Sequence, residues 1–522
     1  MTLPDPEAWP LADPRAWPAR DLLAERAATS PDRTALLDAD ADERWTYAAY
    51  DRRVGRLAER LAAVLGDDGG RVGLLLGTRP AFAATLFATA RLGRSLAPLN
   101  VELSASVLAD QTRRADLAAV VCGRETADLA RTVAPSGVPV ASVDEVRDDD
   151  VAALKFGETD RETGASDERR SVDPATQNRD AERLVLFTSG TTGEPKGVRL
   201  TAGNLVASAV GSAFRLGVRP GDRWLVTLPA YHMGGLAPFV RATLYGTTAV
   251  VRRSFDAAET AAAMADDSVT GVSLVPTMLA RLLDAGWTPP PSLRFVLLGG
   301  APATDDLLRR CERHDVPVYP TYGTTETASQ IATATPTEAF ANPGTVGRPL
   351  DGTTVAVRDG DDPCPPGEPG ELVVSGPTVS PGYLDDDHTA AAFDGDAFHT
   401  GDIGYRDEDG LLWVVGRVDD RIVTGGENVQ PTDVADAIRS HPAIEDAAVV
   451  GLDDPEWGQR VAALVVADGL DAAAVREHCR ERLAGFKRPK TIDFADALPR
   501  TASGTIDRGA VRERLRADAD DG

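Results

Sequence analysis

Lysine is almost absent from this 522-residue chain. The chain has 81 acidic residues against 55 basic ones, which gives a formal net charge of −26. A nucleic-acid partner needs a basic face to bind its phosphates, so this balance argues against one. Four lysines, Lys155, Lys196, Lys487 and Lys490, stand among many arginines, and a lysine in such a background is a candidate for specific chemistry.

Cysteine and histidine are also scarce, which excludes the common metal and disulfide patterns. The four cysteines, Cys122, Cys311, Cys364 and Cys479, lie far apart and form no CxxC pair. Their spacing predicts neither a zinc site nor a disulfide framework, and the six dispersed histidines give no HExxH motif. We therefore expect scattered, reduced thiols.

Long apolar runs are missing too. No stretch approaches the roughly 18–20 apolar residues that a membrane-spanning helix needs. The first residues, MTLPDPEAWPLADPRAWPAR, carry acids and prolines in place of the apolar segment of a secretory signal. We therefore expect a soluble cytoplasmic protein without a membrane partner.

What the chain has in abundance is acidic residues, in clusters such as DADADE (38–43) and RDDDV (147–151). Such clusters indicate a solvated surface, which resists association when salt screens charge. A salt-rich cytoplasm, as in halophilic archaea, is our hypothesis for the origin of this surface. A surface that serves general solubility is the alternative.

Apolar runs alternate with helical patterns over most of the chain, which indicates an α/β fold built in layers. Strands are predicted at 71–77, 117–123, 183–189, 270–276 and 293–300. A helix is predicted over 304–315, where Thr304 can cap the N-terminus. Residues 144–182 are polar and charged, and we expect an exposed loop there.

The pattern changes in the last third of the chain. After about residue 345, short strands separated by Gly, Pro and Asp turns indicate a small β-rich subdomain. From about residue 418 a compact unit of helices and strands follows. We therefore predict a large N-terminal domain of layered α/β subdomains over 1–416, with the β-rich subdomain in it, and a small mobile α+β domain over 417–522.

The stretch LVLFTSGTTGEPKGVRLT (184–201) joins a predicted strand to a turn rich in glycine and hydroxyl groups. Such a turn can point successive backbone N–H groups at one spot, and this arrangement binds anions. Lys196 adds a mobile charge suited to a phosphate, although it does not stand where the Walker pattern requires a lysine. An exposed polar turn without a ligand is the alternative. The residues of this predicted cradle are Thr188, Ser189, Gly190, Thr191, Thr192 and Gly193.

The segment FTSGTTGEPKGV closely resembles the phosphate loop of the adenylate-forming superfamily, which comprises acyl-CoA synthetases, luciferases and adenylation domains. Further motifs of that superfamily follow in order: YGTTET (322–327), TGD (400–402), GRVDDRIVTGGENV (416–429) and LPRTASGTIDR (498–508). The resemblance spans roughly residues 20–510. It implies a ligase that activates an acid with ATP as an acyl-AMP and then transfers the acyl group to a thiol.

The resemblance also implies where ATP and Mg²⁺ bind. Residues 188–193 and Lys196 are expected to bind the β- and γ-phosphates, and Glu326 to hold Mg²⁺. Asp402 is expected to accept hydrogen bonds from the ribose, with Arg417 assisting. Each residue alone has an ordinary structural explanation, and the joint order and spacing favour the site. The other nucleotide positions are Gly300, Ala301, Thr321, Tyr322, Gly323, Thr324 and Thr325, with Tyr322 stacked on adenine.

The superfamily uses two orientations of its small domain for its two half-reactions. Asp419 matches the hinge position, where a few residues absorb large backbone changes. Gly425, Gly426 and Glu427 are expected to line the channel for the pantetheine arm of coenzyme A, because glycine admits a thin chain. No feature of the sequence specifies an oligomeric state.

One position departs from the superfamily pattern. The terminal loop usually reads P-R-T-x-x-G-K, and here Thr505 replaces the lysine that grips the α-phosphate and the substrate carboxylate. Three alternatives follow: another base substitutes, adenylation is slow with the thioester step intact, or the chain is a relative that binds nucleotide without catalysis. The intact phosphate loop, Glu326 and Asp402 favour an enzyme. The candidate substitutes are Arg500, Arg508, Lys487 and Lys490.

Four segments bear on the acid substrate: 229–251, 275–283, 297–303 and 323–331. They resemble the o-succinylbenzoate–CoA ligases of menaquinone synthesis more than fatty acyl or acetyl ligases, which implies an aromatic keto-dicarboxylic acid as substrate. Another aryl- or medium-chain acyl-CoA ligase is the alternative. His232 is expected to gate the acyl and thiol channels and to be catalytic with Lys196 and Glu326, although alone it would more often be a packed core histidine. The remaining acyl-site residues are Gly234, Gly235, Gly299, Gly300, Ser329 and Gln330.

Overall fold

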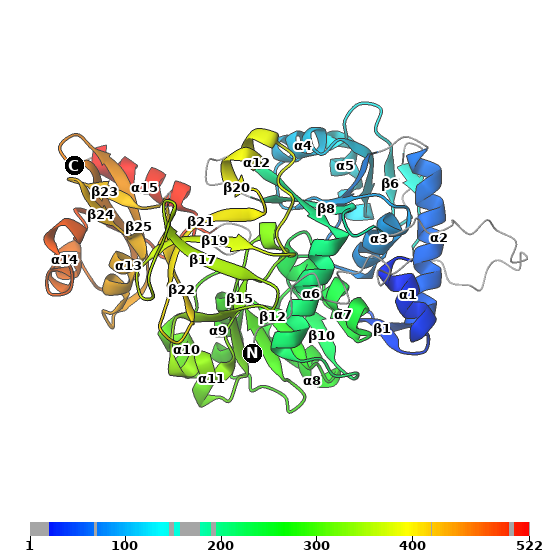
Figure 1. The fold of residues 1–522 in the computed structure, drawn as a ribbon, viewed down its shortest axis with the longest axis horizontal. Helices are drawn as coiled ribbons and strands as arrows, with labels where there is room; N and C mark the ends of the chain where they lie inside the picture. Colours follow the sequence, from blue (N-terminus) through cyan, green and yellow to red (C-terminus); the bar gives the residue numbers. More distant parts are fainter. Residues whose placement is uncertain are drawn as a thin grey trace, which may run out of the picture. The chain divides into compact units, whose positions relative to one another are not determined.

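The computed structural model of the chain describes residues 20–66, 70–145, 151–156, 178–188, 195–418, 420–500 and 506–520. The chain divides into two compact units, and Figure 1 shows their elements in the colours of the sequence. The first unit runs to Thr354 and takes in Val374–Phe398, and the second comprises Val355–Val373 and the chain from His399 onward. The domain boundary between 416 and 417 stays a prediction. Within the described ranges, no helix has the length and apolar character needed to cross a membrane.

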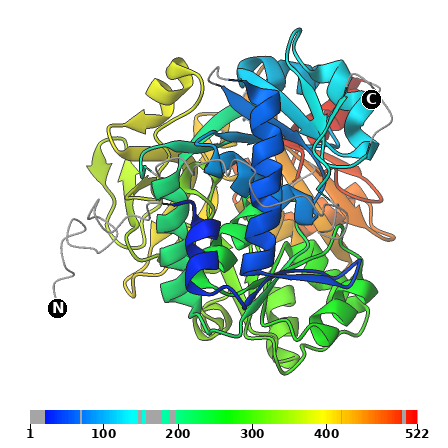
Figure 2. The ribbon, with the colours of Figure 1, turned by 90° about the vertical axis from the view of Figure 1, so that its right-hand side faces the viewer.

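One sheet of the first unit has the strand order β7-β6-β5-β3-β4-β8-β9. All neighbouring strands are parallel except β8 and β9, which form an antiparallel hairpin. Helices cover this sheet, and Figure 2 shows the long helix α2 (Tyr47–Leu65, blue) running across the unit. The strands are β3 (Arg71–Leu75), β4 (Leu96–Pro98), β5 (Leu117–Cys122), β6 (Val140–Ser142), β7 (Val151–Ala153), β8 (Glu182–Thr188) and β9 (Lys196–Thr201).

A second sheet of the same unit has the order β16-β15-β14-β13-β12-β10-β11-β1-β2. Its central strands, from β14 to β1, are parallel, so the segments that follow β10, β12, β13 and β14 emerge at one edge. The strands are β1 (Thr34–Asp38), β2 (Glu43–Thr46), β10 (Arg223–Val226), β11 (Thr248–Val251), β12 (Gly271–Leu274), β13 (Phe295–Leu298), β14 (Val318–Tyr322), β15 (Ala332–Thr333) and β16 (Thr345–Pro349).

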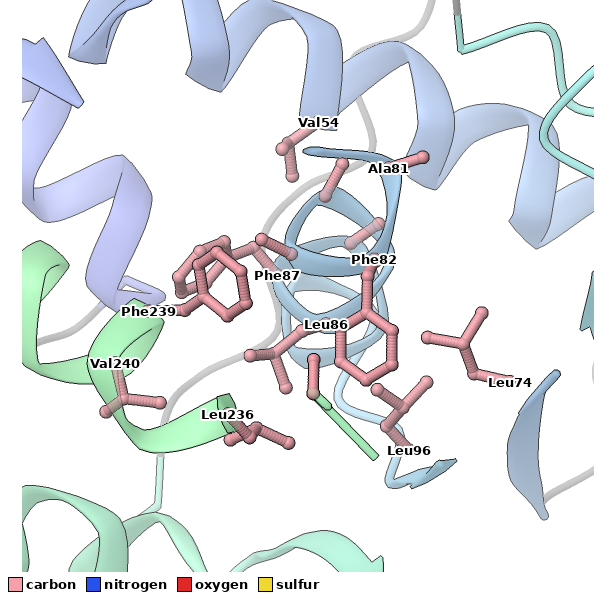
Figure 3. Close-up of a cluster of buried hydrophobic side chains, with 14 of the residues drawn as sticks. Val54, Leu74, Ala81, Phe82, Leu86, Phe87, Leu96, Leu236, Phe239 and Val240 are labelled. Atoms are coloured by element: carbon pink, nitrogen blue, oxygen red, sulfur yellow. The ribbon is translucent and has the colours of Figure 1, made fainter. Parts of the chain in front are cut away.

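Buried apolar side chains pack the helices of this unit against its sheets in several clusters. Figure 3 shows Phe82 and Phe87 of α3 with Leu74 of β3 on one side and Phe239 of α7 on the other. Burial of each such side chain stabilises the fold by about 1.5–3 kcal/mol. The helices are α1 (Leu22–Thr29), α3 (Pro80–Arg91), α4 (Ala105–Arg114), α5 (Ala127–Val133), α6 (Ala202–Leu216), α7 (Met233–Tyr245), α8 (Ala257–Asp266), α9 (Pro276–Asp284), α10 (Asp305–Arg313), α11 (Pro336–Ala341) and α12 (Asp386–Ala392).

The second unit contains short strands and a sheet of order β24-β23-β26-β25, to which β27 adds beside β26. Alternate residues of β25 face opposite sides: Val449 packs with α13 and α14, and Val450 packs with α15. The short strands are β17 (Thr354–Asp359), β18 (Asp362–Pro363), β19 (Gly370–Ser375), β21 (Ala397–Arg406) and β22 (Leu412–Arg417). The others are β23 (Ile422–Thr424), β24 (Glu427–Val429), β25 (Ile444–Asp454), β26 (Gly458–Ala467), β27 (Thr491–Phe494), α13 (Pro431–Arg439), α14 (Ala472–Arg480) and α15 (Arg508–Asp520). Strand β20 (Phe393–Asp394) belongs to the first unit.

The predicted α/β layers are confirmed, and so are several of the predicted elements. Strands β3, β5, β8, β12 and β13 fall on the five predicted strand segments. The predicted cap of α10 is present, because Thr304 Oγ1 accepts a hydrogen bond from Leu307 N at 3.2 Å. The polar segment 144–182 is not entirely a loop, since β7 forms within it and pairs with β6. Residues 146–150 and 157–177 of that segment lie outside the described residues.

All four cysteines are free thiols. Cys122, Cys311 and Cys479 are buried, and Cys364 is partly exposed. Burial raises the pKa of Cys122 to about 11 and that of Cys311 to about 12. These thiols are therefore protonated at neutral pH and behave as apolar core groups.

Candidate active site

The predicted phosphate cradle follows β8 in the chain, and its described ends belong to the paired strands β8 and β9. Thr188 is the last residue of β8 and pairs across the hairpin with Lys196, the first residue of β9. The Thr188 hydroxyl donates to the Lys196 carbonyl oxygen at 3.4 Å. The hairpin thus holds the two described ends of the cradle side by side. Ser189, Gly190, Thr191, Thr192 and Gly193 lie outside the described residues.

A carboxylate fixes the base of the same hairpin. Glu182 accepts hydrogen bonds from Arg71 Nε and from Arg199 Nε, each at 2.7 Å. Burial by itself would raise the pKa of this carboxyl, but the hydrogen bonds from Arg71 and Arg199 outweigh it and hold the pKa below its usual value. Glu182 is therefore ionised at neutral pH and ties β8 and β9 to β3.

Lys196 and Glu326 contact the same buried tyrosine. The hydroxyl of Tyr383 donates to Glu326 Oε1 at 2.9 Å, and Lys196 Nζ lies 5.3 Å from the centroid of the Tyr383 ring. Glu326 is 9% exposed and belongs to the short 3-10 turn Thr325–Thr327 that follows β14. Two of the three predicted catalytic residues are therefore brought together, although 130 positions separate them in the chain.

Glu326 also fits the predicted magnesium ion. Among the described residues, no group of three or more His, Cys, Asp or Glu side chains is arranged to hold a metal. Mg²⁺ prefers oxygen ligands and usually takes most of them from water and substrate phosphates, so it needs only one or two carboxylates. With Oε1 of Glu326 bonded to Tyr383, the second carboxylate oxygen remains for such an ion.

The predicted adenine and acyl segments meet at the carboxyl edge of the second sheet. Gly299, Gly300 and Ala301 follow β13, and Thr321 and Tyr322 end the neighbouring strand β14. Thr324 and Thr325 continue from β14 into the turn that carries Glu326. This is the edge at which open α/β sheets usually bind ligands.

Two glycines at this edge leave no room for a side chain. A Cβ on Gly323 would lie 1.7 Å from the carbonyl oxygen of Ser329. A Cβ on Gly299 would lie 2.8 Å from Cγ2 of Thr321. Any larger residue at Gly323 would therefore displace the segment that carries Ser329.

Ser329 and Gln330 were predicted to supply polar groups to the acid. Ser329 adopts φ of +110°, which is unusual for a residue other than glycine and is typical of functional segments. Gln330 is fully buried, and its amide nitrogen donates to Thr333 Oγ1 at 2.8 Å. Its donor is therefore used inside the protein, whereas no described residue bonds to its Oε1.

His232 occupies the position before helix α7. It is the N-cap residue of that helix, and no described residue bonds to its Nε2 atom, which is shielded from solvent. Burial lowers the pKa of His232, so the imidazole is neutral at pH 7. Gly234 and Gly235 form the first turn of α7, and a Cβ on Gly235 would lie 2.4 Å from the Leu228 and Pro229 carbonyl oxygens. The chain therefore folds tightly back on itself beside His232.

Arg241 of α7 is a candidate that the sequence reasoning missed. Its guanidinium is 1% exposed and lies 5.3 Å from the centroid of the Trp224 ring. In the described part of the chain, neither its Nε nor its Nη2 finds a hydrogen-bond partner. Burial lowers its pKa to about 10, so it still carries its charge at neutral pH. The signal was present as one arginine within an otherwise apolar helix, MGGLAPFVRATLY.

The predicted ribose turn is ordered by its own hydrogen bonds within the second unit. Arg417 Nη1 donates to Asp402 Oδ1 at 2.7 Å, and Asp402 is 7% exposed. Asp402 N donates to Thr400 Oγ1 at 3.0 Å, and Gly401 N donates to Glu371 Oε1 at 3.0 Å. The two predicted ribose residues, Asp402 and Arg417, are therefore brought together as an ion pair.

The predicted coenzyme A residues form the turn of the β23–β24 hairpin. Gly425 and Gly426 both have positive φ, of 60° and 84°, and Glu427 begins β24. Trp457 packs over Gly425, and Lys490 Nζ lies 4.0 Å from the centroid of the Trp457 ring. The predicted hinge residue, Asp419, lies outside the described residues.

The bases that were proposed to replace the missing lysine all have partners in their own unit. Thr505 itself lies outside the described residues. Arg508 pairs with Asp420 at 3.2 Å, Arg500 with Asp446 at 2.8 Å and Lys487 with Asp433 at 2.8 Å, while Lys490 stacks on Trp457. Any of them would have to exchange this partner before it could bind an α-phosphate.

Comparison with known proteins shows the family to which the chain belongs. Residues 23–384 match the family described as AMP-binding enzyme, and residues 433–505 match the AMP-binding enzyme C-terminal domain. The 2-succinylbenzoate–CoA ligase of Bacillus licheniformis is 38% identical over 492 residues, which cover 93% of this chain and 98% of that protein.

Solved structures give the same result. The o-succinylbenzoate CoA synthetase of Bacillus subtilis in complex with the acyl-adenylate intermediate OSB-AMP is 32% identical, with a TM-score of 0.85 over 95% of this chain and 98% of that one. The same synthetase in complex with ATP and magnesium ion has a TM-score of 0.83 at 32% identity, over 95% of this chain and 99% of that one. On these grounds the chain belongs to the AMP-binding enzyme family.

Proposed function

We propose that the chain is an ATP-dependent 2-succinylbenzoate–CoA ligase of menaquinone synthesis. It converts 2-succinylbenzoate, ATP and coenzyme A into 2-succinylbenzoyl-CoA, AMP and diphosphate. The observation that carries this proposal is the extent of the similarity, since the named ligase matches over nearly the whole of both chains. The cluster of Lys196, Tyr383 and Glu326 beside the phosphate hairpin supplies the chemistry that such a ligase needs.

The first half-reaction requires stabilisation of charge on the triphosphate. A carboxylate oxygen of the acid attacks the α-phosphorus, and the bond from that phosphorus to the diphosphate breaks. We propose that Lys196 and the cradle of residues 188–193 bind the β- and γ-phosphates, where negative charge builds up. Glu326 would hold Mg²⁺, which supplies further neutralisation of phosphate oxygens when it is bound.

We assign the nucleoside and the thiol to other residues of the chain. We propose that Tyr322 stacks on adenine and that the Asp402–Arg417 pair binds the ribose. The Gly425–Gly426 turn and Glu427 would admit the pantetheine arm, and Asp419 would act as hinge. In the second half-reaction the thiol sulfur attacks the acyl carbon, and AMP leaves with the bonding electron pair. The neutral imidazole of His232 would line the acyl and thiol channels.

The buried guanidinium of Arg241 supports an acid with a second carboxylate. A buried charge without a partner is costly, and this cost falls when a ligand of opposite charge binds. 2-Succinylbenzoate carries two carboxylates, of which only one is activated. We propose that Arg241, on the helix that begins beside His232, binds the other one. Ser329, Gly299 and Gly300 would complete the acyl site.

A panel of acids tests the proposed substrate. The assay follows AMP release that depends on coenzyme A, with 2-succinylbenzoate, substituted benzoates and hexanoate compared at equal concentration. We expect 2-succinylbenzoate to give by far the highest kcat/KM. If benzoates or hexanoate react faster, the chain is another aryl- or medium-chain ligase and the proposed acid is wrong.

Replacement of Thr505 by lysine tests the alternative of a catalytically weakened relative. We expect the wild type to release diphosphate when it is given ATP and the acid, and the Thr505→Lys variant to do so faster, because a lysine adds charge at the α-phosphate. An inactive wild type that gains activity only as Thr505→Lys would instead identify a chain that binds nucleotide and has lost adenylation.

A cytoplasmic location and a halophilic origin stay predictions of the sequence.

A further inference from the structure

Tyr383 is the one described side chain for which contacts to both Lys196 and Glu326 are seen. Its hydroxyl donates to Glu326 Oε1 at 2.9 Å, and the face of its ring lies toward Lys196 Nζ, 5.3 Å from the ring centroid. The side chain is 4% exposed. The hydroxyl stabilises the carboxylate as a hydrogen-bond donor, and the ring face attracts the ammonium group of the lysine. One residue therefore contacts two charges of opposite sign.

The segment Ser380–Leu384 holds Tyr383 in place. Leu384 N donates to the Gly197 carbonyl oxygen at 2.8 Å, which anchors the segment to β9 directly after Lys196. Ser380 N donates to the Glu326 carbonyl oxygen at 2.7 Å, which anchors the same segment to the turn of Glu326. The ring of Phe393 packs against the edge of the Tyr383 ring, with 5.7 Å between centroids. The position of the tyrosine is therefore set by the two elements that it connects.

We propose that Tyr383 is a positioning residue that sets the Glu326 carboxylate for the metal–triphosphate complex, and that its ring sets the direction of Lys196. Its hydroxyl binds Oε1 and fixes the orientation of the carboxylate, which would leave Oε2 for the ion, so removal of the hydroxyl leaves a carboxylate free to rotate. This inference rests on the proposed function only for the binding of ATP with Mg²⁺, and it is independent of the identity of the acid.

The test is calorimetric titration of the full chain with ATP, in Mg²⁺ and in EDTA, for the wild type and Tyr383→Phe. Phenylalanine keeps the ring that faces Lys196 and removes the bond to Glu326. Tyr50→Phe is the matched control, because Tyr50 is equally buried and its hydroxyl donates only to the Pro80 carbonyl oxygen at 2.8 Å. Thermal unfolding of all three proteins shows whether the two variants lose stability equally.

We expect Tyr383→Phe to weaken ATP binding in Mg²⁺ by about tenfold, which corresponds to one hydrogen bond to a charged group, and to leave binding in EDTA unchanged. Tyr50→Phe should bind as the wild type does in both conditions. An equal loss in Mg²⁺ and EDTA, or no loss at all, would overturn the inference, because the hydroxyl would then act on the nucleotide pocket generally or not at all.

Wild-type protein that fails to bind ATP with Mg²⁺ would overturn both this inference and the proposed function. Wild-type protein that binds ATP but does not react with 2-succinylbenzoate would overturn the acid assignment alone.

Discussion

At the scale of single residues, a substitution at Arg241 tests the proposal that this residue binds the second carboxylate of the acid. Its guanidinium is buried, and neither Nε nor Nη2 has a hydrogen-bond partner among the described residues. We expect Arg241→Met to raise the KM for 2-succinylbenzoate by about 10- to 100-fold, because one hydrogen-bonded charge pair with the second carboxylate is lost. The KM for benzoate, which has one carboxylate, should stay as in the wild type. Steady-state AMP release with both acids measures the two values.

The unfolding temperature of Arg241→Met separates the proposed substrate role from a purely structural one. If Arg241 serves the substrate, methionine removes a buried charge that has no carboxylate partner among the described residues, so the variant should unfold at the same temperature as the wild type or at a higher one. A lower unfolding temperature, with equal changes of KM for both acids, would assign the arginine to the core instead of to the substrate.

The lowered pKa of His232 predicts how stability changes with pH. In the unfolded chain a histidine binds its proton at a pKa of about 6.5, whereas the folded protein binds it only at lower pH. The unfolded state therefore holds more protons in this window, and stability rises with pH. The contribution of His232 is complete above about pH 6.5 and is lost as the pH falls through the folded pKa.

Urea unfolding of the wild type and His232→Gln between pH 8 and pH 5 measures this contribution. We expect the difference in unfolding free energy between the two proteins to be constant above pH 7 and to shift against the wild type as the pH falls. A difference that does not change with pH would show that His232 takes up its proton as readily in the folded state as in the unfolded one.

The candidate residues that the sequence predicted lie in contiguous motifs, whereas those that it missed are recognised by contacts between distant parts of the chain. Lys196, Glu326 and Asp402 stand in contiguous motifs, so their neighbours in the chain identify them. Tyr383 contacts a carboxylate 57 positions earlier in the chain, and Arg241 stands out in the sequence only as one arginine in an apolar helix, with no motif around it. Such roles depend on long-range packing, which a local pattern does not contain.

At the scale of elements, the β8–β9 hairpin depends on one carboxylate at its base. Glu182 accepts hydrogen bonds from Arg71 and Arg199 and is only 16% exposed. We expect Glu182→Gln to lower the unfolding free energy by about 1–3 kcal/mol, because two guanidinium groups lose their charged acceptor. Urea unfolding measures the loss. Glu408→Gln, at an exposed turn position, serves as the control and should change stability by less than about 0.5 kcal/mol.

Most elements were predictable, and the exceptions have physical reasons. Continuous apolar runs predicted β5 and β13 because both faces of these parallel strands are buried. The cap and acidic first turn predicted α10 because both act within one turn of the chain. Strand β7 was missed because it is a three-residue edge strand within a polar segment, and only its pairing with β6 makes it a strand.

At the scale of the whole molecule, the charge of −26 governs the response to salt. Like charges repel across the folded surface, and the screening length falls to about 3 Å at 1 M salt. We expect the unfolding temperature to rise steadily with KCl up to molar concentration. Differential scanning calorimetry over a KCl series measures it. A protein that is stable in dilute buffer and loses its fold in molar KCl would contradict a halophilic origin.

The placement of the thiols has a practical consequence for anyone who studies the reaction. Coenzyme A is consumed as its sulfhydryl disappears, so progress can be followed with a disulfide dye that reacts with free sulfhydryls. Cys122, Cys311 and Cys479 are enclosed, and only Cys364 reaches the surface in part. The enzyme should therefore contribute a small, constant background of at most one equivalent. The same cysteine offers a single attachment point for a fluorophore.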